Sequence, residues 1–132
     1  MRIYTESEAQ ATLPEIVPLL EKMSRGVKQL RAERSAFAAD ARGVTGDGNL
    51  LADPWADEEG SARSGELLAE VQAAAAELET RGIEVKDPER GLIDFHWERE
   101  GELVYLCYLL GEPEIRFWHR IEDGFAGRQP IR

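Results

Sequence analysis

The stretch LIDFHWEREGELVYLCYLLGEPEIRFWHRI, residues 92–121, decides the fold. Apolar and polar residues alternate along three runs, Leu92–Glu98, Glu102–Leu110 and Glu114–Ile121, and such alternation is typical of half-buried strands. The connections Arg99–Gly101 and Gly111–Pro113 have three residues each, which is short enough for hairpins. The sequence therefore predicts a three-stranded antiparallel β-meander.

The register of this sheet follows from asking which pairing separates apolar from polar side chains. Three-residue connections place Phe95 opposite Tyr105 and Cys107 opposite Phe117. One face is then almost wholly apolar, and we expect helices to pack on it, with Cys107 as core filler. The opposite face carries Asp94, His96, Glu98, Val104, Leu106, Tyr108, Glu114, Arg116, Trp118 and Arg120.

The first third of the chain has helical spacing instead. Thr5 and Glu8 form a capping-box pattern that predicts a short helix, and Thr12-Leu13-Pro14-Glu15 repeats the pattern as a second helix start. From Leu13 to Ala41, apolar residues recur at spacings of three and four, which is typical of a coiled-coil seam. A helix from Leu13 to Asp40, about 28 residues, would extend about 42 Å at about 1.5 Å per residue. Part of its seam should meet another subunit, so we expect a homodimer that uses the helical hairpin or the polar sheet face.

A Gly- and Asp-rich segment, 43–60, predicts a long loop, and a further helix over 61–81 completes an antiparallel helical hairpin. The prediction is a single α+β domain, 1–132. It has helices over 5–42, a loop over 43–60, a helix over 61–81, and a sheet with a C-terminal tail over 83–132.

Composition excludes several classes of protein. The 132 residues include one cysteine, so no internal disulfide can form, and no stretch approaches the about 18 apolar residues of a membrane span. A net charge of −10 repels phosphate backbones, which argues against nucleic-acid binding. These features favour a cytoplasmic protein without membrane association.

Catalytic and metal-binding roles find little support in the predicted register. His96 and His119 would point to opposite faces of the sheet, so no metal site, cofactor or catalytic residue is assigned. A buried Cys107 would be unreactive. A metal-dependent enzyme remains the alternative prediction, with ligands drawn from Asp94, His96, Glu98, Glu112, Glu114, His119, Glu122 and Asp123.

The leading functional hypothesis is a non-catalytic interaction or regulatory module. Tyr108, Arg116 and Trp118 would be neighbours on the face turned away from the helices, and such residues are enriched in binding hot spots. Arg128 could fold back beside them and complete a site for a protein partner or a small acidic ligand. The competing interpretation is that Arg128 pairs with Asp123, Glu114 or Glu122 and only fixes the tail.

Four stretches of the chain resemble a family of small bacterial proteins known as domain of unknown function 2203. They are YTESEAQATLPEIVPLLE (4–21), DPERGLIDF (87–95), LGEPEIRFWH (110–119) and GFAGRQPI (124–131). The resemblance covers most of the chain outside residues 43–63. It implies a bacterial cytosolic protein and assigns no activity.

Overall fold

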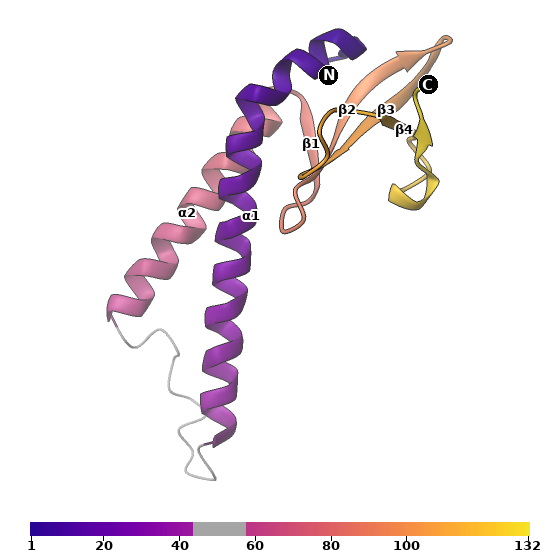
Figure 1. Cartoon of the computed structure of the whole chain (residues 1–132). Helices are drawn as coiled ribbons and strands as arrows, with labels where there is room; N and C mark the ends of the chain where they lie inside the picture. The colour runs from indigo at the N-terminus through magenta and orange to yellow at the C-terminus, as the bar shows by residue number, and fades with distance from the viewer. Residues whose placement is uncertain (44–57) are drawn as a thin grey trace.

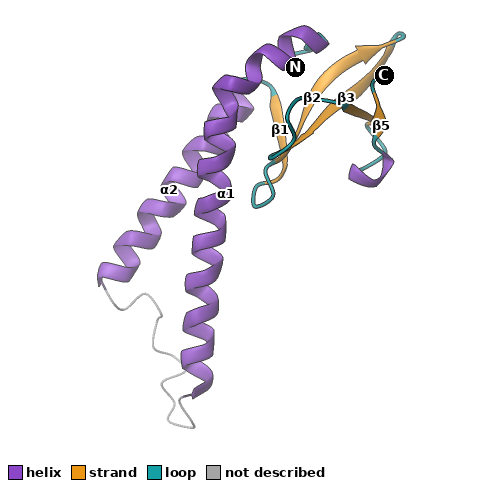
Figure 2. Cartoon of the chain, viewed as in Figure 1, coloured by secondary structure: helices purple, strands orange, loops and turns teal. Residues whose placement is uncertain are grey.

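The computed structural model describes residues 1–43 and 58–132 (Figures 1 and 2). Its elements are α1 (Glu6–Gly43), α2 (Glu58–Thr80), β1 (Ile83–Asp87), β2 (Leu92–Arg99), β3 (Glu102–Leu109), β4 (Phe117–Arg120), the 3-10 helix η2 (Phe125–Gly127) and β5 (Gln129–Pro130). Most of the loop predicted over 43–60 lies outside the described residues, and its last part, 58–60, is helical. Within the described ranges, no helix is long and apolar enough to cross a membrane.

The strands form one antiparallel sheet in the order β1-β2-β3-β4-β5, with the two helices against one face (Figure 1). The α+β class is confirmed. The prediction of three strands is wrong, because β1 adds to the free edge of β2 and the two-residue β5 adds to β4.

Helix α1 is continuous, so the prediction of a short helix followed by a break is wrong. The capping box at its start is confirmed: the Glu8 N–H donates to Thr5 Oγ1 (3.0 Å) and the Thr5 N–H donates to Glu8 Oε1 (2.8 Å). The Thr12 hydroxyl instead donates back to the Glu8 carbonyl. Pro14 and Pro18 lie inside the helix, which bends in this part (Figure 1).

The core lies between the helices and the nearer face of the sheet. Its members come from α1, α2 and all three central strands, and Tyr4 joins them by donating its N–H to the His96 carbonyl (2.8 Å). Burial of residues on both sides of the two prolines explains why α1 continues through them. The buried members include Ala9, Leu13, Ile16, Leu20, Met23, Leu78, Phe95, Leu106, Tyr108, Ile115 and Trp118.

Gln10 fixes α1 to the connection between β3 and β4. Its side-chain amide donates to the Ile115 carbonyl (2.7 Å), and its Oε1 accepts from the Ile115 N–H (3.0 Å). The amide thus provides the two hydrogen bonds that a neighbouring strand would otherwise give to Ile115. These bonds hold the segment before β4 in place.

The turn between β2 and β3 is one residue shorter than the sequence predicts. Arg99 pairs with Glu102, which leaves only Glu100 and Gly101 in the turn. Both have positive φ, 52° and 81°, as a type I′ hairpin requires. The predicted register of this hairpin is therefore wrong by one residue.

Replacing Glu100 by asparagine is expected to raise the free energy of unfolding by up to about 1 kcal/mol. Glutamate in the left-handed region costs about 1–2 kcal/mol, and asparagine tolerates that region better. Urea unfolding measures the change. The same substitution at Glu114, an exposed residue without a positive φ, is the control and should leave stability within about 0.5 kcal/mol. Equal effects at both positions would contradict the turn geometry.

Candidate functional site

The shorter turn decides which side chains share a face of the sheet. Phe95 lies opposite Leu106, and His96 lies opposite Tyr105. Pairing between β3 and β4 agrees with the predicted register, with Tyr105 opposite His119 and Cys107 opposite Phe117. Because side chains alternate along each strand, His96, Tyr105 and His119 form one row across the face turned away from the helices. The expectation that His96 and His119 point to opposite faces is wrong.

The residues predicted to bind a ligand are not gathered on that face. Tyr108 and Trp118 are 3% and 5% exposed and belong to the helix-facing core, so their predicted placement on the outer face is wrong. Arg116 is exposed, with its Nε 3.6 Å from Glu114 Oε1. The guanidinium of Arg99 lies over the Trp118 ring, 4.5 Å from its centroid. A ligand-binding role for Arg116 and Arg128 stays a prediction.

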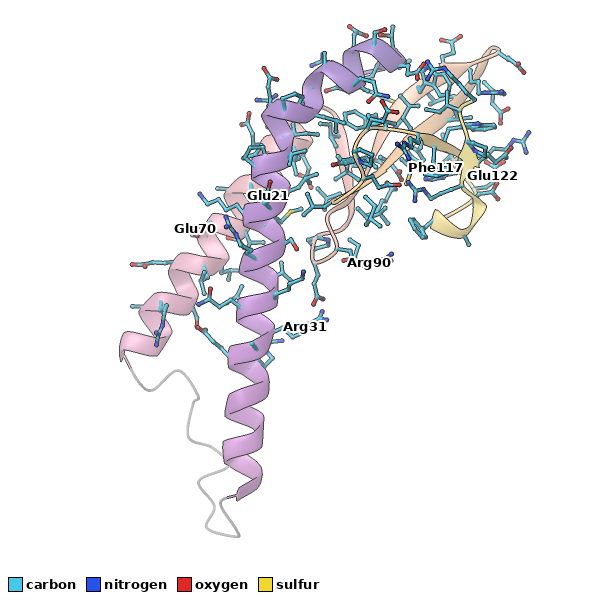
Figure 3. The ribbon with its side chains drawn as sticks, in the orientation of Figure 1. Glu21, Arg31, Glu70, Arg90, Phe117 and Glu122 are labelled. Atoms are coloured by element: carbon cyan, nitrogen blue, oxygen red, sulfur yellow. The ribbon has the colours of Figure 1, made fainter. Side chains whose placement is uncertain are left out.

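Arg128 holds the C-terminal tail against the outer face. Its Nη2 lies 2.6 Å from Glu112 Oε1, and its guanidinium lies 4.1 Å from the Phe117 ring and 4.6 Å from the Phe125 ring. This pairing with Glu112 replaces the predicted partners Asp123, Glu114 and Glu122. Figure 3 shows Phe117 and Glu122 on the side of the sheet away from the helices, where the tail begins.

Three buried side chains from three adjacent strands converge beneath this tail. Asp94 on β2, Cys107 on β3 and His119 on β4 each offer a ligand atom, and these atoms lie within 4.8 Å of one another. The closest pair is His119 Nε2 and Asp94 Oδ1, at 3.1 Å. All three residues are at most 3% exposed. A carboxylate, a thiol and an imidazole are thus enclosed together in the sheet.

The hydrogen bonds of His119 define its tautomer. Its Nδ1 lies 2.8 Å from the Arg120 carbonyl oxygen, and a carbonyl can only accept, so Nδ1 carries the proton. In the neutral ring, Nε2 can then only accept, so its 3.1 Å contact with Asp94 Oδ1 is a hydrogen bond when the Asp94 carboxyl carries the proton. A backbone carbonyl that fixes the ring in this way is a common arrangement for a histidine that binds metal.

Burial also raises the pKa values of the two acidic groups, Asp94 and Cys107. Burial raises the pKa of the Asp94 carboxyl, and the nearby His119 partly offsets that rise. Burial, together with the charge of Asp94, raises the pKa of the Cys107 thiol to about 12. Both effects disfavour uncompensated negative charge at this position.

These features argue against a cysteine nucleophile. A catalytic thiol needs a lowered pKa and a base within hydrogen-bonding reach. Here the thiol pKa is raised, and the two nitrogens of His119 already contact Arg120 and Asp94. A bound cation would change this balance, because coordination deprotonates a thiol. The arrangement therefore suits a metal ligand set better than a nucleophilic dyad.

A cavity of about 320 Å³ adjoins the three residues. Besides Asp94, Cys107 and His119, it is lined by Lys86 of β1, Leu92, Tyr105 and residues 121–125 of the tail. The Tyr105 ring lies between the two imidazoles, with centroids 5.1 Å from His96 and 5.3 Å from His119. The site thus has enclosed ligand atoms and an adjoining space for a small molecule.

The sequence pattern offers Asp94 and His119 as metal ligands but predicts Cys107 in the core. The missed signal was the pair Glu100 and Gly101. Read as a two-residue turn, they shift β2 against β3 and place Asp94 directly opposite Cys107. Asp94, Cys107 and His119 then share one face.

Comparison with known proteins is consistent with the resemblance seen in the sequence. A family model described as an uncharacterized conserved protein (DUF2203) matches residues 2–131. No curated protein and no solved structure matches the chain. Because the family model spans nearly all of the 132 residues, the chain belongs to the DUF2203 family.

Proposed function

We propose that this protein binds a divalent transition-metal ion, with zinc as the best match, through Asp94, Cys107 and His119. The observation that carries the proposal is the convergence of their three ligand atoms within 4.8 Å in a buried position. Nitrogen, sulfur and oxygen donors of this kind are the ligands that proteins use for zinc. The ligand types disfavour magnesium and calcium, which prefer oxygen donors alone.

A bound metal ion would change the charges of these buried side chains. Without metal, the raised pKa of about 12 keeps the Cys107 thiol protonated and uncharged at neutral pH. A bound dication would compensate the charges of the Asp94 carboxylate and the deprotonated Cys107, and it would replace Asp94 as the partner of His119 Nε2. The proposal moves the metal site of the alternative prediction onto Cys107 and away from His96.

Metal content tests this proposal. Protein purified without added metal or chelator is expected to contain nearly one zinc ion per chain by plasma mass spectrometry. Substitution of residues that only support the metal ligands typically lowers metal affinity about 10- to 100-fold. His119→Gln and Cys107→Ala remove a ligand itself, so each should lower the zinc affinity by more than this. The physical reason is the loss of one of three protein ligands.

His96→Gln is the matched control, because His96 is the second histidine on the same face and contributes no ligand to the group. It should retain the wild-type zinc content. Circular dichroism establishes that each variant is folded. Wild-type protein that stays free of metal after incubation with zinc, or a His119→Gln variant that binds it normally, would refute the proposal.

We also propose that the protein is an interaction module that forms a homodimer through its long helices. The helices extend beyond the sheet (Figure 1), and a groove of about 550 Å³ lies between them. Leu68, which lines this groove, is 47% exposed. Together these features favour a dimer in which a second copy of the chain covers the groove over a monomer in which the groove faces solvent.

Light scattering at micromolar concentration should show a dimer that Leu68→Glu weakens, because the change would place a charge in an apolar contact. Ala69→Glu adds the same charge at the neighbouring exposed position and is the control. A wild-type monomer at that concentration would rule out the dimer.

A further inference from the structure

Strand β1 contains an irregularity at Lys86. Val85 pairs with Ile93 and Asp87 pairs with Leu92, which leaves Lys86 as an extra residue without a partner on β2. Such bulges change the direction of a side chain and are over-represented next to functional sites. Here the Lys86 Nζ lies 4.8 Å from the centre of the Tyr105 ring, which belongs to β3, two strands away. The bulge thus brings an ammonium group to the cavity beside Asp94, Cys107 and His119.

We propose that this cavity binds a small carboxylate anion, with one oxygen on the metal ion and the other on the ammonium group of Lys86. The inference rests on the proposed metal function and identifies the class of its ligand. Three protein ligands leave one position of a tetrahedral zinc ion open, as in zinc sites that bind exogenous molecules. Because the cavity adjoins the three ligand residues, it can accommodate a molecule at that position.

Two groups would attract an anion here, the metal ion at its open position and the ammonium group of Lys86. A zinc dication bound by the Asp94 carboxylate and the Cys107 thiolate has no net charge, and Lys86 adds a positive charge beside it. The Lys86 side chain is 41% exposed, and its Nζ lies 2.8 Å from Glu84 Oε2. An incoming carboxylate would share or replace Glu84 as the partner of this ammonium group.

The other charged groups restrict the size and charge of the ligand. Glu122 and Asp123 of the tail line the same cavity. Their carboxylates disfavour a phosphate dianion and are better tolerated by an anion of single charge. The volume of about 320 Å³ lies at the small end of the about 300–1,000 Å³ that is usual for ligand pockets.

The experiment uses cobalt(II) in place of zinc, because bound cobalt reports its ligands by visible absorption. Loading should produce a thiolate-to-cobalt charge-transfer band that Cys107→Ala lacks. Sodium acetate, titrated at constant ionic strength, should then change the cobalt bands with a saturable dependence on concentration. Sodium chloride at the same concentrations measures the effect of salt alone.

Two variants separate the role of Lys86 from a merely structural one. Lys86→Met should load cobalt normally and bind acetate about tenfold more weakly, through loss of one charge-assisted hydrogen bond. Glu84→Gln, which removes the competing partner of Lys86, should strengthen acetate binding. Lys28→Met, on the exposed part of α1, should match the wild type.

The outcomes distinguish this inference from the proposed function. Failure to load cobalt would overturn both. Normal loading without a saturable acetate response would overturn only the open coordination position and its ligand. An acetate response that is the same in Lys86→Met as in the wild type would overturn the assignment of Lys86.

Discussion

Replacing Trp118 by alanine is expected to lower the free energy of unfolding by about 3–5 kcal/mol. Its side chain is 5% exposed and belongs to the core between α1 and the sheet. Truncation leaves a cavity that a close-packed core can only partly fill. For a domain whose total stability is of the order of 5–15 kcal/mol, this is a severe loss. Urea unfolding followed by circular dichroism measures it.

Arg116→Ala is the control for this prediction. Arg116 lies two residues away, and its side chain is 56% exposed, so its removal should change stability by no more than about 0.5 kcal/mol. If Trp118→Ala were equally mild, Trp118 would lie on the exposed face, as the predicted register has it. The pair of variants thus tests the strand register as well as the core.

Zinc is expected to stabilise the wild-type protein and not the His119→Gln variant. At a free zinc concentration about 100 times the dissociation constant, the free energy of unfolding should rise by about 2.7 kcal/mol, because the ion binds the folded site. Thermal unfolding of chelator-treated protein, with and without added zinc chloride, measures the rise. Equal stabilisation of His119→Gln would show that zinc binds elsewhere.

The sequence predicts the class of fold well, because the fold class depends on patterns that extend over many residues. Helical spacing before Gly82 and alternation after it distinguish the helices from the sheet. The short edge strands are harder to detect. β1 has only five residues, and β5 has two, so neither contains enough alternation to stand out from a loop. Their pairing with β2 and β4 depends on the completed sheet.

The candidate site depends on a much smaller signal. Glu100 adopts a positive φ that is uncommon for glutamate, so the turn could not be assigned from residue preference alone. A change of one residue in the length of that turn moves every side chain of β2 to the other face relative to β3. Tyr108 and Trp118 therefore enter the core, while Cys107 joins Asp94. An error of one residue leaves the assignment of helices and strands unchanged, but it separates the three members of the cluster onto different faces.

The contacts of the N-terminal segment also determine when the protein can complete its fold during synthesis. Tyr4 bonds to the His96 carbonyl, and Gln10 bonds to both backbone groups of Ile115, 105 residues further along the chain. Contacts of such high sequence separation are slow to form. The start of α1 leaves the ribosome before β2 and the segment ahead of β4, yet it cannot dock until both have emerged. Until then the apolar residues of this part of α1 lack the sheet that buries them, and transiently exposed apolar surface of this kind is prone to aggregation.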